Sequence, residues 1–154
     1  MKRIFKQVPR ILFGEGSLSQ IKELIPEKLQ NDILFIIDES LPELPILKMV
    51  DGDRIIRFPA RLGEPKTIQV DQINVNLQNN NQKLPTAIIG IGGGSTMDVA
   101  KAVSLMLTNV GESADYQGWD LVEVPGIYKI GVPTISGTGA EATRTCIMTN
   151  RDTG

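Results

Sequence analysis

The chain has 154 residues, of which 41% are hydrophobic and 22% charged, and its formal net charge is −2. These values are typical of one globular domain with its own core, and they give no electrostatic attraction to nucleic acid or to an anionic membrane. The sequence contains no histidine, which excludes a serine-hydrolase triad and removes the commonest side-chain ligand of zinc and iron.

The N-terminus and the single cysteine bear on the compartment. No apolar segment follows the basic start at 1–7, so no secretory signal is predicted, and no stretch is long enough to cross a membrane. Cys146 is the only cysteine, which rules out an internal disulfide and is typical of a reducing cytoplasm. We therefore expect a cytoplasmic protein without a membrane or nucleic-acid partner.

Short elements are predicted for the first part of the chain. Residues 4–8 and 10–13 each predict a short strand, with Pro9 between them at an edge or a bulge. Ser17 is expected to cap a short amphipathic helix. The run 33–38 is apolar until its final aspartate, which is typical of a strand buried on both faces of a parallel sheet.

Asp38, at the end of this run, fits two roles. An acid that follows a dinucleotide-binding strand accepts hydrogen bonds from the adenosine ribose. An aspartate that precedes a helix serves as its N-cap. The sequence leaves both roles open at this position.

Strands and helices then alternate along the chain. A short helix is predicted within 41–50, a strand over 54–58 and a longer helix over 65–81. Another strand, at 88–91, and a further helix continue the alternation. Parallel strands joined by helices predict an open α/β, doubly wound sheet, in which ligands bind beyond the carboxyl ends of the strands.

The most informative stretch joins this last strand to its helix. Within 88–101, an apolar strand gives way to the run Gly92–Ser95 and then to a helical pattern. Consecutive glycines leave backbone N–H groups bare at a helix N-terminus, where an anion such as pyrophosphate binds. Ser95 and Asp98 have the spacing of a capping box. Neither the G-x-G-x-x-G nor the Walker A fingerprint is present, and a glycine turn without a ligand is the alternative.

A second polar, glycine-rich loop follows the strand predicted at 127–132. Residues 133–141 carry four hydroxyl or acidic side chains at the end of this strand, where ligand contacts are expected in a parallel sheet. A solvated loop whose hydroxyl groups bond to the local backbone is the alternative.

The remaining stretches carry less information. Within 111–124, Tyr116 and Trp119 are expected to pack on a loop, because no basic residues interleave with them as in a base-stacking surface. Residues 143–149 predict a strand, and 150–154 predict the turn of a hairpin whose second strand is absent. We therefore expect a fragment of a longer protein.

With both loops in view, the sequence resembles the N-terminal half of the iron-containing (group III) alcohol dehydrogenase family, in the dehydroquinate synthase-like superfamily. The matching signatures are Gly92-Gly93-Gly94-Ser95-x-x-Asp98-x-Ala100-Lys101 and Pro133-Thr134-x-x-Gly137-Thr138-Gly139-x-Glu141. The resemblance implies one Rossmann-like, dinucleotide-binding domain over 1–154, without the helical metal-binding domain of the family.

The resemblance also implies a role for each matching residue. Asp38 would bind the adenosine ribose of NAD, and Asp98 would lie near the nicotinamide ribose or the start of the helix. An acid at position 38 favours NAD over NADP, because a 2′-phosphate would meet a like charge. Ile135 departs from the family, which usually has threonine there. The pyrophosphate would lie on Gly92, Gly93, Gly94 and Ser95, and the nicotinamide side of NAD on Thr134 and Thr138.

The activity implied is that of a metal-dependent dehydrogenase or oxidase that acts on an alcohol or a sugar, with a homodimer as the expected assembly. The family holds iron or zinc on an aspartate and three histidines of its other domain, so no metal ligand and no catalytic residue is assigned in this chain. The stretches 116–120 and 125–129 resemble the branch of the family that serves lipopolysaccharide sugar biosynthesis. The alternative is a stand-alone nucleotide- or anion-binding domain without catalysis.

Overall fold

The computed structural model describes residues 8–79 and 83–150. At its centre lies a sheet of four parallel strands in the order β2-β1-β3-β4. The strands predicted near these positions are confirmed, and none of their ends differs from the prediction by more than one residue. They are β1 (Ile33–Asp38), β2 (Ile55–Phe58), β3 (Ala87–Gly92) and β4 (Tyr128–Pro133).

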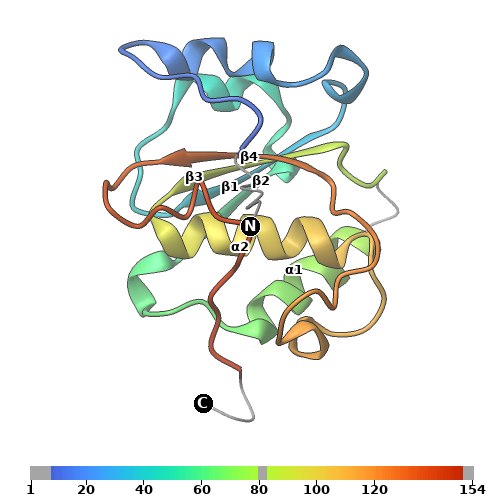
Figure 1. Ribbon diagram of the computed structural model, residues 1–154. Coiled ribbons are helices and arrows are strands. Elements are labelled where there is room, and N and C mark those ends of the chain that lie inside the picture. The colour runs from blue at the N-terminus through green and yellow to red at the C-terminus, as the bar shows by residue number, and fades with distance from the viewer. Residues whose placement is uncertain (1–7, 80–82, 151–154) are drawn as a thin grey trace, which may run out of the picture.

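Helices cover both faces of this sheet (Figure 1). On one face lie α1 (Thr67–Asn79) and α2 (Gly94–Met106). The other face carries the 3-10 helices η1 (Ser17–Leu24), η2 (Glu27–Leu29) and η3 (Pro45–Met49), and the short 3-10 turns η4 (Gly52–Arg54), η5 (Ala60–Leu62) and η6 (Ser113–Tyr116) lie in connections. The predicted α/β, doubly wound architecture is therefore confirmed. No helix within the described ranges is long and apolar enough to cross a membrane.

The sheet separates two apolar cores, because successive side chains of a strand point to opposite faces. In β1, Leu34 and Ile36 pack with α1 and α2, whereas Ile33, Phe35 and Ile37 pack with the 3-10 helices. All of these side chains are buried. Burial on both faces explains why the strand is continuously apolar instead of alternating.

The order of the strands reverses between β1 and β3. From β1 the chain passes to β2 on one side, and from β3 it passes to β4 on the other. The crevice outside the carboxyl ends at such a switch point is the usual ligand site of an open α/β sheet. Asp38 ends β1 there, and Gly92 ends β3.

Every residue of α2 from Thr96 to Ser104 is buried. The sheet covers one side of the helix, and the chain after β4 crosses its outer side (Figure 1). Asp98 and Lys101 are among these buried residues, and each is only 8% exposed although both carry a charge.

Two predicted strands are not formed. Residues 10–13 have no regular structure. Residues 4–7 lie outside the described ranges, as do residues 151–154 of the turn predicted at 150–154. The stretch 143–149 makes a single strand-like pairing among the described residues, a parallel bridge between Thr149 and Lys66. Its backbone is instead bound by side chains of α2, which removes the groups that a neighbouring strand would need.

Two helices begin at other residues than predicted. The N-cap of η1 is Gly16, with a φ of 79°, in place of Ser17. The N-cap of α2 is Gly93, and no side chain caps this helix, so the predicted capping box of Ser95 and Asp98 is wrong. The Asp98 carboxylate has other partners within the fold, which take it away from the helix start.

Candidate functional site

The ends of β1 and β3 lie side by side at the switch point. Ile37 pairs with Ile91, so Asp38 and Gly92 are the next residues on neighbouring strands. Asp38 Oδ1 accepts hydrogen bonds from the backbone N–H of Ser40 at 2.9 Å and from its hydroxyl at 2.7 Å. This turn holds the half-buried carboxylate at the edge of the sheet, and no partner of its second oxygen is found in the described part of the chain.

Asp38 does not serve as a helix N-cap. The next helix, η3, begins at Pro45, and its N-cap is Leu44. Of the two roles that the sequence left open for Asp38, the structural one is therefore wrong, and the ribose-binding role stays a prediction.

The two glycine-rich loops contact each other directly. Gly92 pairs with Pro133, and the Gly92 carbonyl accepts a hydrogen bond from the Thr134 N–H at 2.9 Å. A Cβ atom added to Gly94 would lie 3.3 Å from Thr138 Cβ, so these two residues are in contact. The structure thus brings Asp38 and both loops to one edge of the sheet.

Packing against α2 accounts for Gly92, which the sequence assigned to ligand approach, and also for Gly90 within β3. A Cβ atom on Gly90 would lie 2.7 Å from Ala100 Cβ, and one on Gly92 would lie 2.6 Å from Thr96 Oγ1. Both distances are shorter than side chains allow, so α2 lies this close to β3 only because these residues are glycines. Gly93 and Gly94 differ, because their nearest neighbours belong to the second loop, at 3.3 Å.

The N-terminus of α2 points at this edge of the sheet. Met97 donates the first backbone hydrogen bond of the helix, to Gly93 O at 3.1 Å. The N–H groups of the preceding residues, Gly94 to Thr96, have no carbonyl to bond within the helix, and no side chain caps them. With the positive end of the helix dipole, these donors fit a pyrophosphate.

Asp98 is placed unlike the other candidate residues. Its Oδ1 lies 2.7 Å from Lys101 Nζ, and its Oδ2 accepts a hydrogen bond from the Ile147 N–H at 3.0 Å. The carboxylate is therefore directed at the chain beyond the second loop. The burial of Lys101 was not predicted. The signal for it in the sequence is that 97–107 holds only three polar residues, which indicates a helix covered on most sides.

The residues present do not fit the iron or zinc that the resemblance implies. Within 8–79 and 83–150 there is no group of three or more His, Cys, Asp or Glu side chains that could hold an ion. The sequence has no histidine to contribute. No chemical step is therefore assigned to a metal held by this chain.

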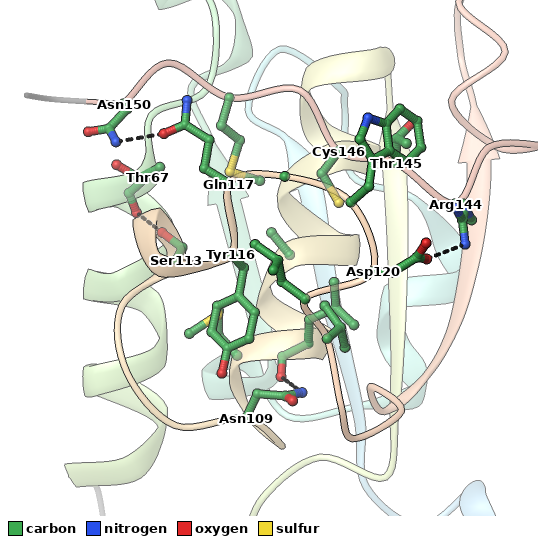
Figure 2. Close-up of a pocket in the computed structure, with 18 residues that line it drawn as sticks. Thr67, Asn109, Ser113, Tyr116, Gln117, Asp120, Arg144, Thr145, Cys146 and Asn150 are labelled. Carbon is green, nitrogen blue, oxygen red and sulfur yellow. Dashed lines mark hydrogen bonds and ion pairs between the residues drawn. The ribbon is translucent and has the colours of Figure 1, made fainter. Parts of the chain in front are cut away.

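A separate cavity of about 340 Å³ lies beside the outer side of α2 (Figure 2). The C-terminal half of α2, the loop 109–122 and residues 144–150 contribute its lining, and none of the candidate cofactor-binding residues does. Tyr116 packs against the core from this loop, as predicted, and its hydroxyl donates to Val110 O at 2.7 Å. Trp119 is 71% exposed instead, and the Arg144 guanidinium lies 5.5 Å from the centre of its ring.

Cys146 lines the same cavity. Burial raises the pKa of its thiol to about 11, and the positive charge of Lys101 offsets only part of this effect. The thiol is thus protonated at neutral pH. Since the thiolate is the reactive form of cysteine, Cys146 is not an activated nucleophile.

Known proteins with similar sequences point to one family. A family model described as iron-containing alcohol dehydrogenase matches residues 9–154. The chain is 39% identical over 156 residues to long-chain-alcohol dehydrogenase 1 of Geobacillus thermodenitrificans, an alignment that covers 92% of this chain and 39% of the relative. It is 29% identical over 149 residues to NAD-dependent methanol dehydrogenase of Bacillus methanolicus, covering 92% of this chain and 38% of the relative.

Solved structures agree with the sequence comparison. Sulfoacetaldehyde reductase from Bifidobacterium kashiwanohense, in complex with NAD+, matches with a TM-score of 0.78 and 25% identity over 98% of this chain and 41% of its own. The chain thus spans 38% to 41% of the length of these relatives. The doubly wound sheet, its two adjoining loops and the match over 9–154 lead to the same conclusion: the chain belongs to the iron-containing alcohol dehydrogenase family.

Proposed function

We propose that residues 1–154 form the NAD-binding part of a metal-dependent alcohol dehydrogenase or oxidase. The observation that carries this proposal is the meeting of Asp38 with the loops at 92–95 and 134–138 at the switch point of the sheet. NAD, when bound, would supply the hydride acceptor for oxidation of an alcohol to a carbonyl, in which the carbon that carries the hydroxyl loses a hydride and the hydroxyl loses a proton to solvent. The NAD+ complex of the similar reductase supports the choice of cofactor.

In this proposal the chain binds and orients the cofactor. The free N–H groups at the start of α2, from Gly94 to Thr96, donate to the pyrophosphate, and the helix dipole stabilises its charge. The hydroxyl groups of Thr134 and Thr138 are exposed on the loop that contacts Gly94, and they bind the nicotinamide side. The cofactor is thereby held across the reversal between β1 and β3.

Asp38 sets the preference for NAD in this arrangement. Its second carboxylate oxygen is available for the hydroxyl groups of the adenosine ribose, since the first is used by Ser40. The negative charge of the side chain disfavours the 2′-phosphate of NADP. The charge of Asp38 can be removed without loss of the turn, because an amide oxygen can accept the hydrogen bonds from Ser40 as a carboxylate oxygen does.

Titration calorimetry of the 154-residue chain with NAD and with NADP tests this role. Asp38→Asn removes the charge and keeps the acceptor for Ser40, so we expect the affinity for NADP relative to NAD to rise about 10-fold, which is about 1.4 kcal/mol. Glu39→Gln is the matched control: it removes the neighbouring carboxylate, which pairs with Arg61 at 2.9 Å. Equal affinity ratios in the wild type and in Asp38→Asn would contradict the assignment.

The chain alone should oxidise no alcohol, because it has no histidine and no metal-binding cluster among its described residues. NADH formation by the purified chain, free of any longer form, would overturn this expectation. The alternative function, a nucleotide- or anion-binding domain without catalysis, predicts that the chain binds a nucleoside triphosphate and not NAD. Calorimetry with both ligands distinguishes the two functions.

For the substrate we propose the C8 hydroxyl of 3-deoxy-D-manno-octulosonate. The support is the resemblance of 116–120 and 125–129 to the 3-deoxy-D-manno-octulosonate 8-oxidase of lipopolysaccharide sugar biosynthesis. The whole of the first stretch, 116–120, lines the cavity beside α2. Oxidation of this sugar acid in preference to methanol by the longest natural form of the protein tests the proposal, and sedimentation of that form tests the homodimer.

A further inference from the structure

We propose that the buried pair of Asp98 and Lys101 positions the second cofactor loop: it clamps the chain that follows β4 onto α2 and so keeps Thr138 against Gly94. This inference rests on the proposed NAD site. Both residues act through the backbone that they hold, and neither is assigned a contact with the cofactor.

Lys101 supplies the cation of this clamp. Its Nζ lies 2.7 Å from Asp98 Oδ1, donates to Ala140 O at 3.1 Å and to Thr143 Oγ1 at 3.2 Å, and also donates to Thr145 O. An ammonium has three N–H donors, so the hydrogen bonds to Ala140, Thr143 and Thr145 use all of them. Apart from Asp98, every partner belongs to the segment 140–145 and none to α2.

Asp98 holds the same segment at a second point. Its Oδ1 pairs with Lys101, and its Oδ2 accepts the Ile147 N–H at 3.0 Å. The segment 140–147 therefore crosses α2 with three of its backbone groups bound by one ion pair. Because both charges are buried, each depends on the other, and removing one leaves the other without compensation.

The clamp is fixed close to the cofactor loop. The Ala140 carbonyl is bound by Lys101, and the Ala140 N–H donates to Thr138 Oγ1 at 3.4 Å. Ala140 is buried, whereas the loop residues 133–138 are exposed. The bond from the Thr134 N–H to Gly92 O fixes the upstream end of the loop, and Ala140 fixes its downstream end. Loss of Lys101 would release that second end.

Lys101→Met in the 154-residue chain tests the clamp, because methionine keeps most of the side-chain length and removes every polar contact. We expect the NAD dissociation constant, measured by calorimetry, to rise about 3- to 30-fold. Hydrogen–deuterium exchange should become faster in peptides from 134–147. The double variant Asp98→Asn with Lys101→Met has no unpaired buried charge, so it should regain thermal stability without regaining NAD affinity, since Ala140 O and Thr145 O still lack their donor.

Arg54→Met is the matched control. Arg54 pairs with Asp32 at 3.2 Å, and its side chain is 12% exposed, against 10% for Lys101. Both residues of the control pair precede strands, Asp32 before β1 and Arg54 before β2, so they lie at the amino edge of the sheet, opposite the cofactor loops. This variant should lower the melting temperature and leave the NAD dissociation constant unchanged.

The outcomes separate a positioning role from a structural one. Wild-type NAD affinity in Lys101→Met overturns the proposal, and so does an equal loss of affinity in Arg54→Met. If the wild type binds no NAD, the proposed function fails, and hydrogen exchange still decides the clamp. Faster exchange in Lys101→Met confined to 134–147 then supports it, and unchanged exchange there overturns it.

Discussion

Replacement of Gly92 by alanine should destabilise the fold through a contact with α2. The added Cβ atom would lie 2.6 Å from Thr96 Oγ1 and 2.7 Å from Thr96 Cβ. Carbon atoms in ordinary contact lie about 3.5–4.0 Å apart, so β3 and α2 must separate locally by about 1 Å. Thr96 is fully buried, and rotation of its side chain does not move its Cβ atom. Rotation of the Thr96 side chain therefore cannot relieve this contact.

Overpacking of a buried site costs about 1–3 kcal/mol. In a domain of this size, each 1 kcal/mol lowers the melting temperature by about 2–4 °C. We therefore expect Gly92→Ala to melt about 2–12 °C below a reference variant in which the same substitution meets no neighbour.

Gly52→Ala provides that reference. A Cβ atom at Gly52 meets nothing within 4 Å, and its φ is not in the left-handed region. Both variants share the loss of glycine flexibility in the unfolded chain, so thermal unfolding followed by circular dichroism isolates the contact. Equal melting temperatures for the two variants would refute the explanation of Gly92 by packing against Thr96.

Three further predictions follow from the same structure. Gly93→Ala should lower NAD affinity more than stability, because residue 93 lies in the loop proposed to bind the pyrophosphate. The nearest atom to the added Cβ would be Cδ1 of the exposed Ile135, at 3.3 Å, so the fold itself can accommodate the methyl group. Calorimetry and thermal unfolding of the same variant check this prediction. Ile36→Ala should cost about 2–5 kcal/mol in urea unfolding, since Ile36 is fully buried in the core beneath α1 and α2; a cost below about 1 kcal/mol would contradict that packing. Burial raises the pKa of Cys146 from 9.0 to about 11, so between these values the folded chain keeps a proton that the unfolded chain loses. Stability should therefore fall as the pH rises through this window, and urea unfolding of Cys146→Ala should lack that decline.

The sheet and its ligand edge could be predicted because their signals are local. Burial of β1 on both faces leaves an apolar run that ends at Asp38, and parallel strands carry their ends to one edge. The same reasoning placed the two glycine-rich loops together without any knowledge of how they touch. Their contact, between Gly94 and Thr138, depends on the path of the chain after β4 and needed the structure.

Two of the errors, the capping box and the strand at 143–149, share one physical cause, which is competition for polar groups between distant parts of the chain. Ser95 and Asp98 have capping-box spacing, but Lys101 and the Ile147 N–H take the carboxylate. The stretch 143–149 was predicted as a strand, and Cys146 and Met148 do pack against the core. Its backbone is nevertheless bound by side chains of α2. Lysine is rarely buried, so the small number of polar residues in 97–107 was not enough to predict the burial of Lys101.

The most direct test of the central claim is amide chemical-shift mapping of the 154-residue chain with NAD. If NAD binds at the switch point, the signals of Gly93, Gly94 and Ser95 and of residues 134–138 should shift in a saturable way. The signals of Tyr116 and Trp119, at the cavity of about 340 Å³, should stay in place. Saturable shifts at that cavity with none at the two loops would contradict the proposed site.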